Sequence, residues 1–347
     1  MIIVRIESGL GNQMLDFAEY LAVKKAFPNV SVYADLTIFD INQKVNLPIS
    51  QWNGYELNSI FGINILTLKD LLGSDYDNLI DRLIESQFWD NDWRYAPIIV
   101  GYLNEKGYCI ENMCALGTNG PSKVPFSKKV LGLLREKNYY LYRYGYTNIC
   151  RMIAPYLNRN KLSLYYPGKT DNFYCGQTLN FMMKGYGIEK IKNELMQSFE
   201  FPISGLSERN RKFIEKIEKK NCTSIHVRRG DFLVKNDFCY RFGYFSRAVK
   251  YIKKRCGCKI FIIFCDNESV SWVKENLSIF GLSSTDHIHF VTWNTGKQSF
   301  WDMYLMSKCR NNVVTQSSFG WWATFFNSNK NKITCSPDVR INTTNWF

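Results

Sequence analysis

The sequence predicts an α/β fold in which parallel strands alternate with helices along much of the chain. Three observations support this class. The chain opens with a strand, a glycine loop, a helix and a second strand. From about residue 208 onward, short apolar runs alternate regularly with helical patterns, and no internal repeat or low-complexity tract interrupts them. Such alternation is typical of βαβ units, which build doubly wound parallel sheets.

The opening elements can be placed from the pattern of apolar residues. Residues 2–6 form an apolar run that predicts a strand, and residues 9–12 (GLGN) break it. Residues 13–27 then carry apolar side chains at helical spacing up to Pro28. Residues 30–34 alternate like a second strand. The middle of the chain, roughly residues 40–190, shows no comparably regular pattern.

The C-terminal part is more regular. Phe245, Ala248, Val249 and Ile252 follow the spacing of one helix face, so they predict a helix. The remaining predicted helices cover residues 208–220, 269–277, 299–309 and 319–326. The predicted strands cover residues 223–227, 260–265, 289–292, 313–315 and 333–335. A chain of 347 residues predicts two domains, and we place their boundary near residue 200.

Composition narrows the class of protein. Hydrophobic residues make up 46% and charged residues 22%, an ordinary globular balance. The net charge of +13 favours partners rich in phosphate, such as nucleotides, nucleic acid or anionic lipid. The basic runs at residues 209–220 and 250–255 have apolar residues at helical spacing. They predict solvated helix faces, with attraction to a membrane surface as the alternative.

The cysteine and histidine content and the N-terminal residues argue against a disulfide framework, a metal centre and a signal peptide. The 11 cysteines are odd in number and scattered, which argues against a disulfide framework. Three histidines are too few for a convincing histidine metal centre, and we expect no metal and no cofactor. Residues 90–92 (DND) could hold a divalent ion, but they follow no clear strand and are interpreted as a loop. The apolar opening is too short for a signal peptide, so we expect a cytoplasmic protein, peripheral to the inner face of a membrane at most.

The strongest candidate site follows the strand predicted at residues 223–227. Arg228, Arg229, Gly230 and Asp231 come directly after it. Ligands of doubly wound sheets bind at the carboxyl ends of strands, and guanidinium groups pair bidentately with phosphate. Gly230 allows close backbone approach, and Asp231 can hold an arginine in place. This pattern predicts a diphosphate clamp, with a surface Arg–Asp pair as the alternative.

Three more segments stand at comparable positions. Asp266 follows the next strand, where it could contact a base or ribose or only cap the following helix. Ser317 and Ser318 begin a helix, and they are expected to cap a helix start that can bind an anion. The glycine loop that holds Asn12 could approach phosphate or sugar, or could be only a tight turn.

These segments together resemble the α-1,2-fucosyltransferases of glycosyltransferase family 11. The resemblance rests on residues 9–13 (GLGNQ), 226–231 (HVRRGD), 264–267 (FCDN), 293–297 (WNTGK), 302–307 (DMYLMS) and 317–322 (SSFGWW). It covers residues 1–25 and 222–327, whereas the middle is only faintly similar. Among the departures, Ser8 stands where the family usually has glycine, and Gly320 replaces a serine.

The resemblance implies a GT-B fold, with two Rossmann-like domains that face each other across a cleft. Residues 1–200 would form the acceptor-side domain and residues 201–347 the GDP-fucose-binding domain. The implied reaction transfers L-fucose from GDP-β-L-fucose to the 2-hydroxyl of a galactoside in a glycan, with inversion and without a metal.

The residues can then be given roles in that reaction. Negative charge builds on the departing GDP, and without a metal it must be stabilised by fixed cations. Arg228 is expected to be the main diphosphate contact, with Arg229 as its partner or structural brace. Ser317 and Ser318 are expected to add hydroxyl and N–H donors at the helix start.

The remaining assignments concern the nucleoside, the sugar and the base. His226 is expected near guanosine or phosphate, Asp266 near the nucleoside, and Asn12 near the sugar or diphosphate. The attacking hydroxyl is helped by a general base, for which Asp231 and Asp16 are both candidates. Neither is singled out, because Asp231 could instead orient an arginine and Asp16 departs from the family pattern.

Two other functions remain open at this point. The arginine motif fixes the donor class better than the linkage, so a fucosyltransferase of another linkage or another GDP-sugar transferase would fit it. A basic RNA-binding protein would explain the net charge and the aromatic residues. However, no RNP-type aromatic pattern and no helix-turn-helix is evident.

Overall fold

The computed structural model describes residues 1–47, 53–114, 126–146, 148–149, 152–153, 171–176, 181–230 and 233–347. The chain forms two compact units. The N-terminal unit comprises Met1–Gly132 and Pro155–Glu200, and the C-terminal unit comprises Leu133–Ala154 and Phe201–Phe347. The chain therefore passes between the units three times, so neither unit is one continuous stretch.

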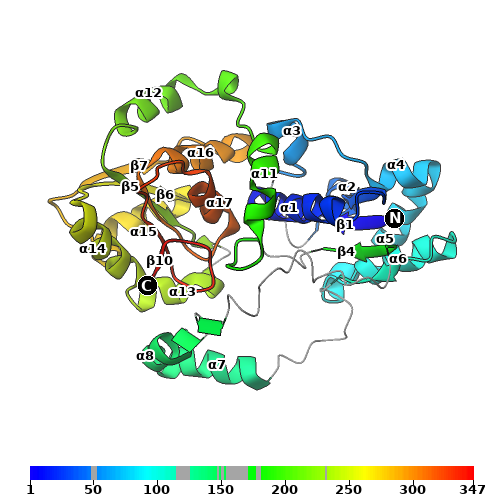
Figure 1. Ribbon diagram of the computed structural model, residues 1–347, viewed down its shortest axis with the longest axis horizontal. Coiled ribbons are helices and arrows are strands. Elements are labelled where there is room, and N and C mark those ends of the chain that lie inside the picture. The colour runs from blue at the N-terminus through cyan, green and yellow to red at the C-terminus, as the bar shows by residue number, and fades with distance from the viewer. Residues whose placement is uncertain are drawn as a thin grey trace. The chain divides into compact units, whose positions relative to one another are not determined.

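The N-terminal unit is built on a parallel sheet with the strand order β2–β1–β4–β3. Figure 1 labels two of its strands, β1 and β4. Its strands are β1 (Ile2–Arg5), β2 (Val32–Asp35), β3 (Glu111–Asn112) and β4 (Phe173–Cys175). In the centre of the sheet, Ile2 pairs with Val32 on one side and Phe173 on the other. All residues of β1 are buried, which explains why an apolar run predicted this strand correctly.

The helices of this unit are mostly short. They are α1 (Leu10–Ala26), α2 (Thr37–Lys44), α3 (Leu57–Phe61), α4 (Leu68–Leu72), α5 (Tyr76–Glu85), α6 (Ala96–Glu105) and α11 (Lys192–Ser198), with 3-10 turns η1 (Gly73–Asp75), η2 (Phe88–Asp90) and η4 (Ile188–Ile191). Helix α1 begins three residues earlier than predicted. The reason is that Gly9 is its N-cap and the Gly9 carbonyl accepts the N–H groups of Asn12 and Gln13, at 2.9 and 3.1 Å.

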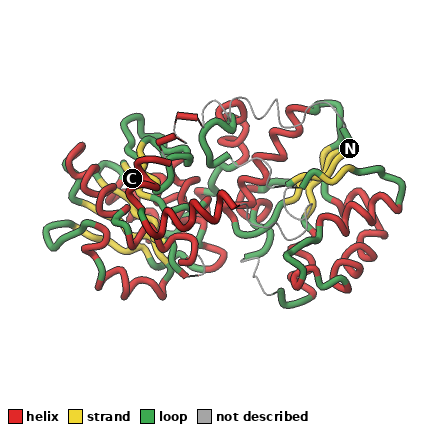
Figure 2. The backbone as a smooth tube through the Cα atoms, turned by 90° about the horizontal axis from the view of Figure 1, so that it is seen from below, coloured by secondary structure: helices red, strands yellow, loops and turns green. Residues whose placement is uncertain are grey.

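The C-terminal unit holds a second parallel sheet, with the order β10–β9–β8–β5–β6–β7. Its strands are β5 (Cys222–Val227), β6 (Ile260–Cys265), β7 (His287–Val291), β8 (Asn311–Val313), β9 (Thr334–Ser336) and β10 (Asn345–Trp346). Figure 2 shows the strands of each sheet bordered by helices. Because both sheets are parallel and interleaved with helices, the predicted α/β class is confirmed.

The helices that belong to this unit cover its sheet. They are α8 (Tyr139–Leu141), α12 (Glu208–Ile217), α13 (Leu233–Arg241), α14 (Tyr244–Cys256), α15 (Val270–Glu275), α16 (Phe300–Lys308) and α17 (Ser318–Phe326), with the π-helical turn η3 (Tyr142–Tyr146) and the 3-10 turns η5 (Ile203–Gly205), η7 (Asn267–Ser269), η8 (Leu277–Phe280) and η9 (Gly296–Gln298). Helix α7 (Phe126–Lys137) contains the point where the first unit ends. The predicted face of α14 is confirmed, since Phe245, Ala248, Val249 and Ile252 are fully buried.

Some predicted boundaries are wrong in this unit. Strand β8 ends at Val313 rather than residue 315, and β10 follows the strand that was expected to be the last. The helix expected at residues 269–277 is shorter, because a 3-10 turn precedes α15 and a second one follows Asn276. Strands of two or three residues carry too little periodicity to be recognised in a sequence.

The two basic runs form the solvated helix faces that their spacing predicts. The run at residues 209–220 lies largely on α12 and the run at residues 250–255 lies on α14. Their apolar members Ile217 and Ile252 are buried, while Lys212, Lys216 and Lys254 are exposed. None of the helices in the described parts of the chain is both long and apolar enough to span a bilayer.

Candidate functional site

The candidate site lies along one edge of the C-terminal sheet. Strand β5 pairs with β6 on one side and β8 on the other, with Val227 opposite Cys265 and Ile225 opposite Val313. Because all three strands run parallel, the residues after them emerge at the same edge. Arg228 follows β5, Asp266 follows β6, and residues 314–318 follow β8 to the start of α17.

Arg228 and Asp266 face each other across this edge. The Nη1 atom of Arg228 lies 3.5 Å from Oδ1 of Asp266, and the two side chains are 21% and 35% exposed. This separation is long for a hydrogen bond. The carboxylate therefore orients the guanidinium group, and the Arg228 side chain stays partly exposed. The Asp266 side chain makes no capping bond to the helical turn that follows; the Asp266 carbonyl accepts the Ser269 N–H instead. The alternative that Asp266 acts only as a helix cap is therefore wrong.

Arg229 has different surroundings from Arg228. Its guanidinium carbon lies 3.4 Å from the centre of the Trp272 ring and 5.4 Å from the centre of the Tyr240 ring. The Tyr240 hydroxyl in turn donates to the Arg228 carbonyl at 3.0 Å. These contacts stabilise the loop after β5. They favour the role of structural brace for Arg229, because stacking on Trp272 occupies one face of its guanidinium group.

The glycine after the two arginines also has a structural requirement. Gly230 adopts a φ of +41°, in the left-handed region that L residues with side chains rarely occupy. A Cβ atom added there would lie 3.4 Å from Oδ2 of Asp266. Asp231 lies outside the described residues, so its role as a base or an arginine partner stays a prediction.

His226 is buried beneath this edge, one residue before the end of β5. Its side chain is 7% exposed, and Nδ1 has no hydrogen-bond partner among the described residues. Burial, assisted by the nearby charge of Arg228, lowers the pKa of His226 to about 3. The ring also packs against Gly320, where an added Cβ atom would lie only 2.5 Å from Nδ1. His226 is therefore a neutral imidazole. Its ring occupies space that a side chain at position 320 would otherwise fill.

The start of α17 completes the edge. Ser317 is the N-cap residue of α17 and is buried, but its side chain makes no capping hydrogen bond. The expectation that the serines cap this helix is thus wrong for Ser317. Just before it, the buried Thr315 Oγ1 has no hydrogen-bond partner in the described part of the chain. Helix α17 has nine residues, so the N–H groups of its first turn give this edge a partial positive charge.

Asp302 is a residue of the site that sequence reasoning did not assign. It lies in the first turn of α16 and accepts a hydrogen bond from Asn294 Nδ2 at 2.7 Å. Burial raises the pKa of Asp302 to about 7. The carboxylate also acts electrostatically on Cys265, the last residue of β6. The segment that contains Asp302 was recognised in the sequence, but only the fold brings this carboxylate near the strand ends.

Asn12 belongs to the N-terminal unit, at the start of α1. Its Nδ2 atom donates to Oγ of Ser8 at 3.1 Å. Ser8 itself has a φ of +70°, a conformation in which glycine would be unstrained. The next residue, Gln13, is fully buried and bonds to the carbonyls of Ser8 and Gly54, at 2.8 and 2.9 Å. The glycine loop is therefore a hydrogen-bonded helix start, and its approach to phosphate or sugar stays a prediction.

Asp16 lies one turn further along α1, and its role as a general base stays a prediction. Its side chain is buried and accepts the N–H of Glu7 at 3.1 Å. Burial raises the pKa of Asp16 well above its usual range, with a further contribution from the neighbouring Glu7 carboxylate. These partners give Asp16 a structural role between β1 and α1.

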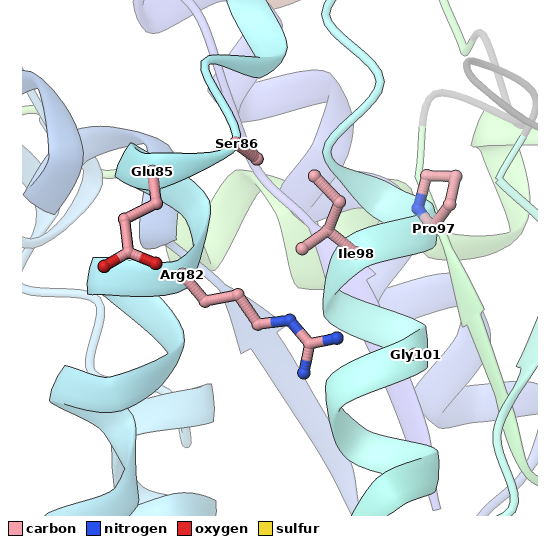
Figure 3. Close-up of a pocket in the computed structure, with 6 residues that line it drawn as sticks. All are labelled: Arg82, Glu85, Ser86, Pro97, Ile98 and Gly101. Atoms are coloured by element: carbon pink, nitrogen blue, oxygen red, sulfur yellow. The ribbon is translucent and has the colours of Figure 1, made fainter.

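A groove in the N-terminal unit lies away from the residues discussed so far. It is an open groove of about 380 Å³ between α5 and α6, lined by Arg82, Ile98 and Gly101 among others (Figure 3). Arg82 is held there by Glu105, with 2.8 Å between Nη2 and Oε1. The groove contains none of the residues that the sequence singled out. Within the described ranges, no group of three or more His, Cys, Asp or Glu side chains is placed to hold a metal ion.

Comparison with known proteins adds an independent observation. The family model described as Glycosyl transferase family 11 matches residues 165–340. The O-antigen biosynthesis glycosyltransferase WbnK of Escherichia coli is 32% identical over 126 residues, which are 35% of this chain and 39% of that protein. An alpha-1,2-colitosyltransferase of Escherichia coli is 30% identical over 133 residues, 37% of this chain and 41% of that protein.

The aligned share of each protein differs between the curated relatives and the solved structure. The aligned part spans only about two fifths of the length of each curated relative. A solved structure of the NodZ alpha-1,6-fucosyltransferase, co-crystallised with GDP, aligns over 93% of this chain and 91% of its own, with a TM-score of 0.42 and 12% sequence identity.

Proposed function

Because the chain belongs to glycosyltransferase family 11, we propose that it is an inverting α-1,2-fucosyltransferase that uses GDP-β-L-fucose as its donor. The acceptor in this proposal is the 2-hydroxyl of a galactoside in a glycan. One curated relative is named an alpha-1,2-transferase and the other acts in O-antigen biosynthesis, which supports a 1,2 linkage and a glycan acceptor.

The observation that carries the proposal is the Arg228–Asp266 edge beside the start of α17. A diphosphate bound there would meet the Arg228 guanidinium group and the N–H groups of the first turn of α17. Both kinds of donor favour negative charge, and both are fixed before the reaction begins. Charge that develops on the leaving GDP is then stabilised without a metal ion. Arg229 contributes by holding the loop in place through Trp272.

Buried His226 and partly buried Asp302 are suited to the nucleoside of the donor. Neutral His226 can offer one ring nitrogen as a hydrogen-bond donor or acceptor, depending on its tautomer. The Asp302 carboxylate can accept hydrogen bonds from the N–H groups on the edge of a guanine base. Adenine and uracil do not present the same pair of adjacent N–H donors. We therefore assign base selectivity to Asp302 and the nearby ribose contact to Asp266.

The acceptor side of the reaction is assigned to the N-terminal unit. In a GT-B arrangement the acceptor lies between two domains, and Asn12 would contact the fucose or the diphosphate from that side. Asp231 remains the proposed general base, because it directly follows the arginine pair. The protein would act in the cytoplasm in this proposal.

Calorimetry tests the donor class directly. The full-length protein is titrated with GDP, ADP and UDP, each with and without EDTA. We expect selective GDP binding that EDTA leaves unchanged. A preference for UDP, or loss of GDP binding in EDTA, would refute a metal-independent GDP-sugar transferase.

A second candidate function is kept because one relative is named for a different sugar. In that case the chain would transfer another sugar from GDP, or would form another fucosyl linkage. Incubation with GDP-fucose and other GDP-sugars, followed by linkage analysis of the product, separates these cases. A fucosylated galactoside with a 1,2 linkage supports the proposal, and any other product supports the alternative.

A further inference from the structure

The C-terminal unit carries an unusual concentration of exposed apolar side chains. Six of the ten large apolar residues that are exposed in the described parts of the chain lie between residues 133 and 153. We call these six residues the apolar segment: Leu133, Tyr140, Leu141, Ile149, Met152 and Ile153. Leu133 and Leu141 are each 55% exposed and Met152 is 73% exposed. Exposure of so many apolar groups to water is unfavourable, and a patch of this kind indicates a surface that binds another molecule or a membrane.

The segment is not simply unfolded chain, because its neighbours are anchored to the body of the unit. The Tyr139 ring stacks on Phe242, with 4.4 Å between ring centres and an angle of 6°. Arg247 donates to the Tyr139 hydroxyl at 3.4 Å, and the Arg135 guanidinium carbon lies 5.3 Å from the centre of the Phe238 ring. Tyr139 and Arg135 thus hold α8 and the end of α7 in place, while Leu133, Tyr140 and Leu141 point to solvent.

The charges around the apolar segment have one sign. Residues 126–153 contain six lysine or arginine residues and a single acid, Glu136. Lys129 and Lys137, which flank Leu133 on α7, are both exposed. The same stretch contains five tyrosines, a residue type that concentrates at the boundary between lipid and water. A basic, tyrosine-rich helical segment with exposed apolar side chains matches the pattern of interfacial membrane helices.

We propose that the apolar segment docks the protein on an anionic lipid membrane. The apolar side chains would enter the boundary between headgroups and acyl chains, and the flanking lysines would contact the lipid phosphates. The net charge of +13 adds long-range attraction to the same surface. Charge favours lipid over a second copy of this chain, because two such basic segments would repel each other. The proposal does not depend on the identity of the donor or the acceptor.

The test is co-sedimentation of the full-length protein with vesicles. One set contains phosphatidylcholine alone, and the other contains phosphatidylcholine and phosphatidylglycerol in equal parts. We expect binding to the anionic vesicles that weakens as salt is raised. The double variant Leu133→Glu/Leu141→Glu should bind at least about tenfold more weakly, since burial of a single leucine is worth more than a factor of ten.

The matched control is Leu66→Glu, which changes a leucine of similar exposure, 52%, in the N-terminal unit. This variant should bind vesicles like the unchanged protein. Circular dichroism and thermal unfolding confirm that each variant folds, and GDP binding provides a readout of an intact C-terminal unit. Absence of vesicle binding overturns the proposal, as does equal weakening by both leucine changes. Self-association that the double variant abolishes, without vesicle binding, would assign the segment to a second copy instead and equally overturn it.

Discussion

At the scale of single residues, Arg228 is the side chain on which the proposed chemistry depends most. Replacement by lysine keeps the charge but removes the planar fork that can hold two phosphate oxygens at once. We expect Arg228→Lys to lower turnover by well over tenfold, with thermal unfolding unchanged because the side chain is partly exposed. The measurement is steady-state transfer from GDP-fucose.

The matched control for this change is Arg82→Lys. Arg82 also pairs with a carboxylate, that of Glu105, but it lies in the groove between α5 and α6. Its replacement should leave turnover within a factor of about two, because an exposed ion pair contributes little. Near-normal turnover of Arg228→Lys would remove Arg228 from the diphosphate site.

His226 and Asp302 give stability a pH dependence that can be separated by mutation. The pKa of His226 falls to about 3 on folding, so between pH 6.5 and 3 only the unfolded chain takes up that proton and acid destabilises the fold. The pKa of Asp302 rises to about 7, so between pH 7 and 4 the folded chain takes up the proton and acid stabilises it. The two contributions oppose each other across most of this range.

Chemical unfolding at a series of pH values separates the two groups. In His226→Gln, the free energy of unfolding should gain, relative to the unchanged protein, up to about 1.4 kcal/mol for each pH unit below 6.5. Asp302→Asn should have the opposite effect below pH 7. Parallel curves for His226→Gln and the unchanged protein would show that this histidine is not buried in its neutral form.

At the scale of elements, the start of α1 depends on one buried amide. Gln13 bonds to two carbonyls and accepts the N–H of Glu56 at 2.9 Å. Gln13→Ala removes these three hydrogen bonds, and we expect a loss of about 2–4 kcal/mol in the free energy of unfolding. Asn12→Ala is the matched neighbour, since Asn12 makes a local bond to Ser8. It should cost under about 1 kcal/mol, and thermal denaturation of both variants measures the difference.

The elements also show what could be predicted from the sequence. Strands β5 and β6 each have six residues, and both were located within one residue of their observed bounds. Strands β3 and β10 have two residues each, and neither was predicted. Strand β4, with three residues, was also missed, because it lies in the middle region where no regular pattern is visible.

The same limit applies to the candidate site. The positions of Arg228 and Asp266 at the sheet edge were predictable, because each directly follows a strand whose end was located. Ser317 was placed at a helix start after β8, although the end of that strand was predicted two residues too late. Asp302 was not, since it lies within a helix and reaches the strand ends only through tertiary packing. The brace role of Arg229 likewise required Trp272, which is 43 residues away in the chain (272 minus 229).

At the scale of the whole molecule, the assignment of donor binding to the C-terminal unit can be tested with GDP. We expect GDP to slow hydrogen exchange in peptides that contain residues 226–230 and 317–322. Ligand binding to the folded state alone should also raise the melting temperature. Arg228→Lys should reduce both effects at the same GDP concentration. Slower exchange confined to peptides of the N-terminal unit would contradict the placement of the donor in residues 201–347.

The path of the chain between the units has a consequence for synthesis on the ribosome. In the N-terminal sheet, β4 lies between β1 and β3, so this sheet is incomplete until residue 175 has been made. By then residues 133–154 have already been made, whereas Phe242, on which Tyr139 packs, follows Tyr139 by 103 residues (242 minus 139). The nascent chain must therefore carry the apolar segment without its anchor while the first unit closes. In the order of synthesis, the anchor of the apolar segment is therefore completed only after the N-terminal sheet has all its strands.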